Sequence, residues 1–269
     1  MTLLSVRGLS KSFRGVRALH DVSFDVADGR ILGIIGPNGA GKTTLFAAVS
    51  GGVAADAGTV RFAGQDVTRW PDHRRARAGL VRTFQLMRPF GAMTVLDNVA
   101  VAAQVRASSR AAALAAPDAV LDRVGLARYR DQRSTELPAA ELKRLELARA
   151  LALRPRLLLL DEVLAGLVPA ERGPVLDLLG TLRDEGITLV FVEHVMAAVM
   201  RLSDEVLVLD QGQVIAAGTP AEVTGDPRVV EAYLGDEAAL ASGDDGDDGN
   251  DGNDGNDDDA DDEDPETPC

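Results

Sequence analysis

The chain has 269 residues and a formal net charge of −14, and 46% of its residues are hydrophobic, enough for one large folded domain. Residues 241–269 hold 14 of the 42 Asp and Glu residues and no Lys or Arg, so residues 1–240 carry 28 acidic and 28 basic residues. This balance of charges excludes a domain with a net basic charge, as nucleic-acid binders have, and one with a salt-adapted acidic surface. No apolar run in the sequence is long enough to span a membrane.

The sequence predicts a cytoplasmic location. Its single cysteine, Cys269, is the last residue, so an internal disulfide cannot form, which suits a reducing compartment. Residues 1–4 lead directly into strand-like alternation and show no signal-peptide pattern.

The first predicted elements are short strands with alternating apolar residues, at residues 3–9, 22–26 and 58–62. We expect these strands to be antiparallel. Between them, the apolar run of residues 31–35 predicts a buried parallel strand, and residues 42–50 predict a helix.

A phosphate-binding loop joins this buried strand to this helix. Residues 36–44 read Gly-Pro-Asn-Gly-Ala-Gly-Lys-Thr-Thr. Free backbone N–H groups and the helix dipole converge on phosphates at such a loop, whereas a Gly-rich turn that binds nothing would not need both flanking elements. We expect Lys42 to neutralise the β- and γ-phosphates and Thr43 to ligate Mg²⁺. The predicted nucleotide-binding residues of the loop are Gly36, Asn38, Gly39, Gly41, Lys42, Thr43 and Thr44.

A mostly helical insertion is predicted at about residues 88–155. It follows a strand predicted at Val81–Gln85, and its first helix begins after Thr94, which is a suitable N-cap. Residues 107–116 are rich in Ser, Arg and Ala and extend a helix or form a loop between helices. A strong helix is predicted from Glu141 to Leu153.

Two adjacent carboxylates follow the next buried strand, Arg156–Asp161. Asp161 is expected to hold Mg²⁺ through its water shell, and Glu162 to polarise the water that attacks the γ-phosphate. The alternative interpretation is a solvent-facing acidic turn at a strand end, and the presence of a phosphate-binding loop in the same chain disfavours it.

The C-terminal elements place a histidine at the same edge of the predicted sheet. A helix is predicted from Pro169 to about Glu185, and a buried strand from Thr188 to Glu193. His194 follows this strand at the ligand edge, although a lone histidine is often structural. A hairpin is predicted around Gln211-Gly212, followed by a helix that Thr219 caps.

The last 29 residues are predicted to be disordered. Residues 241–269 consist largely of Asp, Gly and Asn without apolar periodicity, so they cannot bury a core. The predicted organisation is therefore one folded domain at residues 1–240 and an acidic tail.

The motifs together resemble the nucleotide-binding subunits of ABC transporters over about residues 2–235. The phosphate loop, Gln85, Asp161-Glu162 and His194 are similar to that family's Walker A motif, Q-loop, Walker B motif with catalytic glutamate, and switch histidine. The resemblance implies ATP as the nucleotide with Mg²⁺, a catalytic and metal-binding role for Gln85, and stacking of Phe13 on adenine, where plain packing is the alternative. It also implies a P-loop NTPase core of mostly parallel sheet with an antiparallel β subdomain and a helical insertion.

Within this family, the chain is most similar to the ATPases of branched-chain amino acid importers. The resemblance implies a cytoplasmic ATPase, peripheral on the inner face of the cell membrane. Its partners would be two transmembrane permeases, a second ATPase and, indirectly, an external solute-binding protein. Close relatives move urea or other amides or export lipid, so these remain alternatives. The resembling stretches are residues 82–85, 93–99, 161–167, 192–196 and 231–235.

One segment departs from the family pattern. The signature, usually Leu-Ser-Gly-Gly-Gln, aligns here with Leu137-Pro138-Ala139-Ala140-Glu141. The serine hydroxyl, both glycines and the glutamine are missing, which puts this chain's contact to its partner's ATP in question.

Two other classes compete with a transporter ATPase. A soluble ABC ATPase of DNA repair or translation usually carries two nucleotide domains or a long coiled-coil insertion, and this chain has neither. A nucleotide-binding regulator without hydrolysis is disfavoured by the presence of Glu162 and His194.

Overall fold

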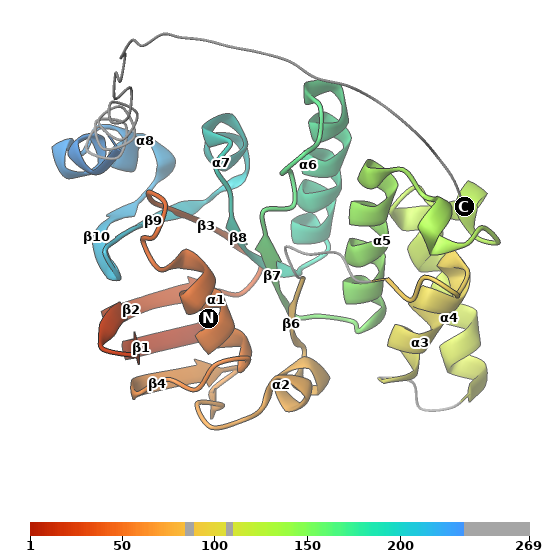
Figure 1. Cartoon of the computed structure of the whole chain (residues 1–269), viewed down its shortest axis with the longest axis horizontal. Coiled ribbons are helices and arrows are strands. Elements are labelled where there is room, and N and C mark those ends of the chain that lie inside the picture. The colour runs from red at the N-terminus through yellow and green to blue at the C-terminus, as the bar shows by residue number, and fades with distance from the viewer. Residues whose placement is uncertain (84–88, 106–109, 234–269) are drawn as a thin grey trace, which may run out of the picture.

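The computed structural model describes residues 1–83, 89–105 and 110–233, and only the backbone of residues 110–116. It contains two β-sheets with helices packed around them (Figure 1). The first sheet is antiparallel and has the strand order β2-β1-β4-β5. Its strands are β1 (Thr2–Phe13), β2 (Val16–Ala27), β4 (Ala57–Phe62) and β5 (Gln65–Asp66).

The second sheet has six strands in the order β10-β9-β3-β8-β7-β6, all parallel except β10. This confirms the predicted α/β fold with a mostly parallel sheet and an N-terminal antiparallel sheet. The strands are β3 (Ile31–Ile35), β6 (Leu80–Arg82), β7 (Leu157–Asp161), β8 (Thr188–Val192), β9 (Glu205–Asp210) and β10 (Gln213–Gly218).

The central strands are apolar at almost every position because both faces of the sheet are covered. All five residues of β3, β7 and β8 are buried. Successive side chains of a strand point to opposite faces, so Leu158 and Leu160 pack with the larger helices while Leu157 and Leu159 pack toward the antiparallel sheet. Helix α1 (Lys42–Ser50) lies on this second side and buries Leu45 there.

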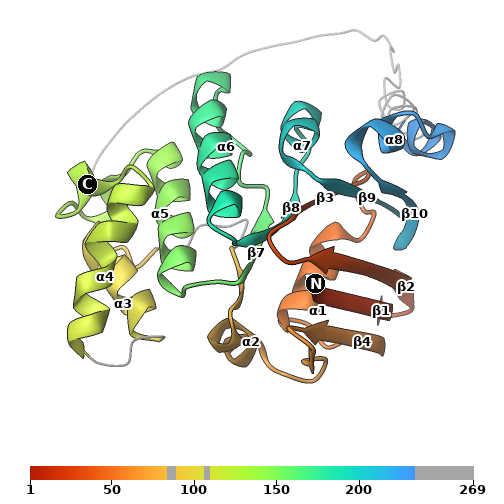
Figure 2. The same cartoon turned by 180° about the vertical axis from the view of Figure 1, so that it is seen from behind.

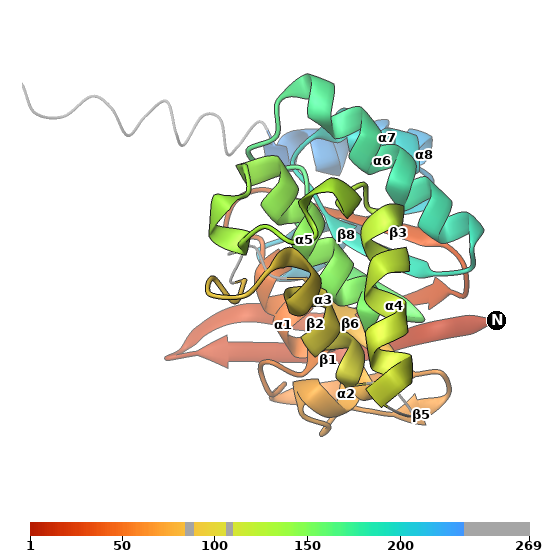
Figure 3. The ribbon, with the colours of Figure 1, turned by 90° about the vertical axis from the view of Figure 1, so that its right-hand side faces the viewer.

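Helix α2 packs beside α1 and β6, and the other helices cover the opposite face of the six-stranded sheet or extend beyond it. Helices α3, α4 and α5 gather on the side away from the antiparallel sheet, with α6 next to α5 (Figures 1 and 2). The side view also shows α4 beside α3 and α5 (Figure 3). The helices are α2 (Asp72–Ala78), α3 (Val95–Gln104), α4 (Arg110–Arg123), α5 (Ala139–Ala152), α6 (Pro169–Asp184), α7 (Met196–Leu202) and α8 (Pro220–Thr224), and two 3₁₀ turns lie at Ala127–Tyr129 and Ser134–Glu136.

Local sequence signals fixed several helix ends. Helix α1 has the predicted bounds because Gly41 and Gly51, one at each end, adopt the left-handed conformation that glycine favours. The Thr94 side chain accepts a hydrogen bond from the Asp97 amide, which confirms Thr94 as the N-cap of α3. Thr219 and Glu222 form a capping box at α8.

Two parts of the fold differ from the sequence prediction. Strand β6 spans only Leu80–Arg82, and Gln85, which was predicted to end it, lies outside the described residues. Helices α2 and α7 and strand β5 were not predicted. These elements are short, and four of the seven residues of α2 are charged, so α2 has little apolar periodicity. The tail at residues 241–269 also lies outside the described residues.

Arg75 of α2 stabilises the end of α1. Its guanidinium is buried, with 2% of the residue exposed, and it donates to the carbonyls of Ala48 and Val49 in the last turn of α1 and to those of Thr68 and Trp70. Burial lowers the pKa of this guanidinium from its usual value. Arg75 thus donates to two carbonyls in the last turn of α1, where a helix leaves carbonyls without partners of its own.

Replacing Arg75 is therefore expected to destabilise the fold. Arg75→Met removes four hydrogen bonds to backbone carbonyls, of which the Ala48 carbonyl keeps a bond from the Gly51 amide, and we expect a loss of about 3 kcal/mol in the free energy of unfolding. Urea denaturation measures it. Arg74→Met on the same helix is the control. Arg74 is exposed, and its guanidinium carbon lies 3.9 Å from the ring centroid of Trp70. This variant should lower the free energy of unfolding by no more than about 1 kcal/mol. Equal losses in the two variants would contradict the assignment.

Candidate active site

The phosphate-binding loop occupies the turn from β3 to α1, where the chain runs very close to its neighbours. Gly36 and Gly41 have φ values of 150° and 100°. A Cβ atom at Gly36 would collide with the carbonyl of Leu209, and one at Gly41 with the carbonyl of Ala18. Glycine is therefore required at both positions for this loop to close against β2 and β9.

Lys42 lies folded over the loop. It is 7% exposed, and its Nζ atom donates to the carbonyls of Gly36 at 2.7 Å and Pro37 at 2.8 Å. The first turn of α1 contains no acidic residue, so the N-terminus of this helix keeps its attraction for anions. Thr43 is exposed beside it, and Thr44 is half-buried. The ammonium of Lys42, the N-terminus of α1 and the hydroxyl of Thr43 together form a site that suits a phosphate group.

The two predicted carboxylates lie at the carboxyl end of β7 and have different partners. Asp161 is 4% exposed and forms an ion pair with Arg82, with 2.8 Å between Oδ2 and Nη2. Glu162 instead lies 2.9 Å from His194, measured from Oε1 to Nε2. Since a carboxylate only accepts, the ring nitrogen supplies the proton of this hydrogen bond.

The predicted histidine is thus brought to the predicted general base. Strand β8 pairs with β7, and the chain leaves both strands at the same edge, so Glu162 and His194 follow neighbouring strand ends. The side chain of Glu162 is 19% exposed and that of His194 is 48% exposed, which leaves both accessible from solvent. This geometry can hold and orient a water molecule.

Comparison with known sequences decides the family. A sequence model described as "ABC transporter" matches residues 19–165, which is more than half of the chain. The chain belongs to the ABC transporter family. A second model, described as "Branched-chain amino acid ATP-binding cassette transporter", matches residues 213–239.

Several curated relatives of this ABC transporter subunit are similar over most of the chain. The high-affinity branched-chain amino acid transport ATP-binding protein BraF of Pseudomonas aeruginosa is 37% identical, over 87% of this chain and 98% of its own length. LivG of Escherichia coli, with the same description, is also 37% identical over the same shares. The probable LivG of Archaeoglobus fulgidus is 36% identical, over 87% of this chain and 96% of its own length.

Solved ABC transporter cassettes share the fold. A nucleotide-free ATP-binding cassette from an ABC transporter has a TM-score of 0.78 and 31% identity, and it covers 87% of this chain and 99% of its own. The ADP conformation of the cassette MJ1267 has a TM-score of 0.78 and 32% identity over the same shares. As a member of this family, the chain is an ATP-binding ATPase that couples hydrolysis to transport, and such subunits work with membrane permease components.

The structure gives the other predicted site residues unequal support. Phe13 ends β1 with 46% of the residue exposed, and Lys11 Nζ lies 5.3 Å from its ring centroid, so the ring is open to a ligand. Gln85 lies outside the described residues, and its role in this ABC transporter subunit stays a prediction.

The altered signature starts helix α5. Pro138 is its N-cap, and no side chain caps the helix. Glu141 lies in the first turn and contacts Arg128 at 3.4 Å and the Tyr129 hydroxyl at 3.5 Å. A carboxylate at a helix N-terminus offsets the positive end of the dipole, so this end of α5 attracts a phosphate less than α1 does.

Sequence reasoning missed three charged residues around the carboxylates. Arg82 pairs with Asp161, Lys143 donates to the Glu162 carbonyl at 3.1 Å, and the buried Glu193 accepts from the Leu164 amide at 2.7 Å. Burial raises the pKa of Glu193, whereas burial lowers the pKa of Lys143. The only local signal was for Glu193, an acidic residue that directly follows the apolar run of residues 189–192.

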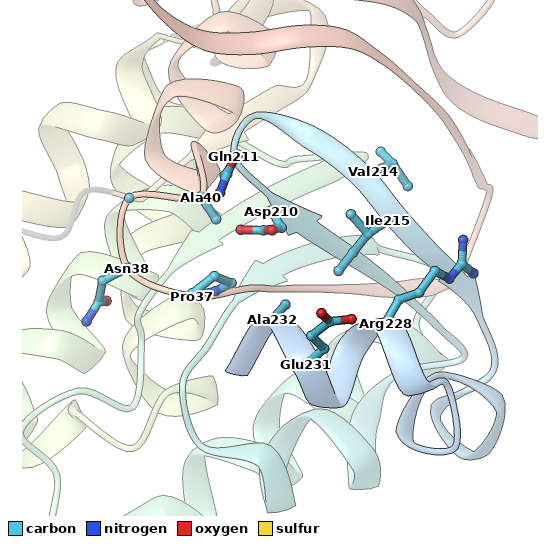
Figure 4. Close-up of a pocket in the computed structure, with 11 residues that line it drawn as sticks. Pro37, Asn38, Ala40, Asp210, Gln211, Val214, Ile215, Arg228, Glu231 and Ala232 are labelled. Carbon is cyan, nitrogen blue, oxygen red and sulfur yellow. The ribbon is translucent and has the colours of Figure 1, made fainter. Parts of the chain in front are cut away.

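A pocket of about 760 Å³ lies against one flank of the phosphate loop (Figure 4). Its lining comes from residues 37–40 of the loop, from residues of β9, β10 and the turn between them, and from Arg228, Glu231 and Ala232 after α8. Asp210 and Glu231 place two carboxylates there, and Val214 and Ile215 make part of it apolar. The guanidinium of Arg228 also lines the pocket but is paired with Asp226, and the two carboxylates repel phosphate. This pocket therefore suits the phosphates of ATP less than the N-terminus of α1 does.

Proposed function

We propose that this ABC transporter ATPase drives the import of branched-chain amino acids or related small polar solutes. Two sequence similarities support the proposal. The chain is 37% identical to ATP-binding proteins named for branched-chain amino acid transport, and residues 213–239 match the corresponding family model. Uptake of urea or amides, and lipid export, are the alternatives within transport.

In the proposed mechanism, each part of the chain has one task. The loop glycines, Asn38, Lys42 and Thr44 bind the phosphates, and Phe13 stacks on the adenine. Glu162 polarises the attacking water, and His194 orients Glu162 through their 2.9 Å contact. Gln85 is proposed to sense the γ-phosphate.

The residues present fit a Mg²⁺ ion. Within residues 1–83, 89–105 and 110–233, no group of three or more His, Cys, Asp or Glu side chains is placed to hold a metal. An ion would therefore rely on the Thr43 hydroxyl, Gln85, Asp161 through water, and phosphate oxygens, which are the hard oxygen ligands that Mg²⁺ prefers. When bound, it would neutralise phosphate charge.

The proposed setting is the inner face of the cell membrane. Across the part of the chain that the structure describes, no helix has the length and apolar character to cross a bilayer. We propose that residues 1–240 form the ATPase domain, with a helical subdomain at about residues 88–155. It would assemble with two permeases and a second ATPase, and act indirectly with an external solute-binding protein, without nucleic acid.

Affinity purification tests this assembly. The full chain is tagged, purified from detergent-solubilised membranes and its partners are identified by mass spectrometry. We expect multi-span permease chains and a second ATP-binding subunit in comparable amounts. Recovery of the chain with nucleic acid, or only with soluble repair or translation proteins, would contradict the proposal.

The altered signature predicts that the two ATP sites of the assembly are unequal. Pro138 lacks a backbone donor, Ala140 adds a methyl group, and Glu141 adds negative charge where a partner's phosphate would lie. We expect weak turnover of the isolated chain at every concentration, because two copies would supply only altered signatures. The double substitution Pro138→Ser and Ala140→Gly should raise turnover about tenfold, because the first change returns a backbone N–H and a hydroxyl that can stabilise phosphate charge and the second removes the added methyl group.

A phosphate-release assay over a range of protein concentrations measures this effect. Adding Glu162→Gln to the double variant is the control, since it should remove the gained activity. Strong, concentration-dependent turnover of the unmodified chain alone, or no gain in the double variant, would show that the signature does not limit the reaction.

A further inference from the structure

The turn that carries Glu162 is held in a conformation that this residue does not favour by itself. Glu162 has a φ of 50°, in the left-handed region that disfavours residues other than glycine. Its amide donates to the Val192 carbonyl at 3.0 Å, and its carbonyl accepts from the Ala165 amide at 3.1 Å. The conformation therefore depends on contacts around the turn.

One of these contacts comes from a distant helix. Lys143 lies in the second turn of α5, two residues after the altered signature, and its Nζ atom donates to the Glu162 carbonyl at 3.1 Å. Glu162 itself follows β7 in the central sheet. Lys143 thus fixes the backbone of the carboxylate-bearing turn from the helical layer.

A second contact joins the two strand ends of the site. Glu193 is 3% exposed, and its Oε1 atom accepts from the Leu164 amide at 2.7 Å. The His194 amide also interacts with this carboxylate. Glu193 therefore links the turn after β7, which carries Glu162, to the turn after β8, which carries His194.

The charges of these two residues support each other. The positive field of Lys143 favours the ionised carboxylate of Glu193, and the negative fields of Glu193 and Glu162 favour the charged ammonium of Lys143. A carboxylate this deeply buried is stable only with such partners. Neither side chain is in the set that we assign to nucleotide or water, so their role lies in the geometry of their neighbours.

We propose that Lys143 and Glu193 are positioning residues, which hold Glu162 and His194 in the relative orientation that hydrolysis requires. The proposal rests on the proposed role of Glu162 as the base. It also makes that orientation depend on where α5 sits, because Lys143 reaches the turn only from that helix.

Variants of Lys143 test the first contact. Lys143→Met in the full chain, assembled with its membrane partners, should lower kcat about tenfold and leave the KM for ATP within about twofold, because only the geometry of the base changes. Lys143→Arg keeps a donor and should recover most of the loss. Arg144→Met removes the neighbouring cation of α5, which contacts Glu141 rather than the turn, and is the matched control.

Amide hydrogen exchange gives a readout that does not depend on turnover. In the full chain without nucleotide, Lys143→Met should speed exchange in the peptide of residues 161–168 and leave it unchanged in α1. Glu193→Leu should do the same at the Leu164 amide, and Glu193→Gln, which keeps an acceptor, should restore much of the protection.

These measurements test the positioning roles of Lys143 and Glu193 separately from the role of Glu162 as the base. Normal kcat and normal exchange in Lys143→Met, or equal effects in Arg144→Met, would overturn the positioning roles. Glu162→Gln is measured alongside, and full turnover in that variant would instead reject the role of Glu162 on which the inference rests.

Discussion

Replacing Glu162 by glutamine should lower ATP turnover by about 10²-fold or more and leave the affinity for ATP within about twofold. Glutamine has nearly the same shape and keeps an oxygen and an amide for hydrogen bonding, so the contact at His194 can persist. It cannot take a proton from water. The expected loss is therefore confined to the chemical step, which phosphate release measures while equilibrium binding of a fluorescent ATP analogue measures affinity.

Two further variants show whether the loss of turnover is specific to the carboxylate of Glu162. Glu205→Gln removes an exposed carboxylate at the start of β9, outside the residues assigned to the site, and should leave turnover unchanged. His194→Ala should lower turnover less than Glu162→Gln does, because the histidine orients the base and is not itself the base. If His194→Ala altered only the melting temperature, His194 would be a structural residue.

Replacing Lys42 by methionine should weaken ATP binding by about 10²-fold or more. Lys42 donates to the carbonyls of Gly36 and Pro37, so its ammonium is held over the loop. Its hydrogen bonds to phosphate oxygens would be charge-assisted, and about 2.7 kcal/mol of such binding corresponds to this change in affinity. Methionine keeps the aliphatic stem but has no donor.

Binding and folding must be measured together for this variant, since two loop hydrogen bonds are also lost. Equilibrium titration with ATP gives the affinity, and a thermal melt shows whether the loop remains folded. Affinity within about threefold of the unmodified chain, in a protein that melts normally, would reject the assignment of Lys42.

Elements with strong local signals could be predicted from the sequence. The strands β3, β7 and β8 are apolar at almost every position because both faces of the sheet are covered, and each begins within a residue of its predicted start. Helix α1 follows a glycine-rich loop that only a few conformations can close. Short elements such as α2 and β5 lack such a signal, since packing rather than pattern selects them.

The candidate site also has parts that the sequence could predict and parts that it could not. The Gly36–Thr44 loop and the pair Asp161-Glu162 are contiguous in sequence, so residue type and spacing were enough to suggest them. The ion pair of Arg82 with Asp161 and the bond from Lys143 to Glu162 join residues that are 79 and 19 positions apart. Such contacts depend on how strands and helices pack, and a single sequence does not contain them.

Solute uptake tests the central claim most directly. Uptake of radiolabelled leucine is measured in cells that lack this gene, and again after the unmodified chain or its Glu162→Gln variant is supplied at equal protein levels. Urea uptake is measured in parallel to distinguish the main alternative importer. We expect deletion to abolish high-affinity leucine uptake, the unmodified chain to restore it, the variant to fail, and urea uptake to stay constant. Leucine uptake that is unaffected by the deletion, or that the Glu162→Gln variant restores as well as the unmodified chain does, would contradict the account.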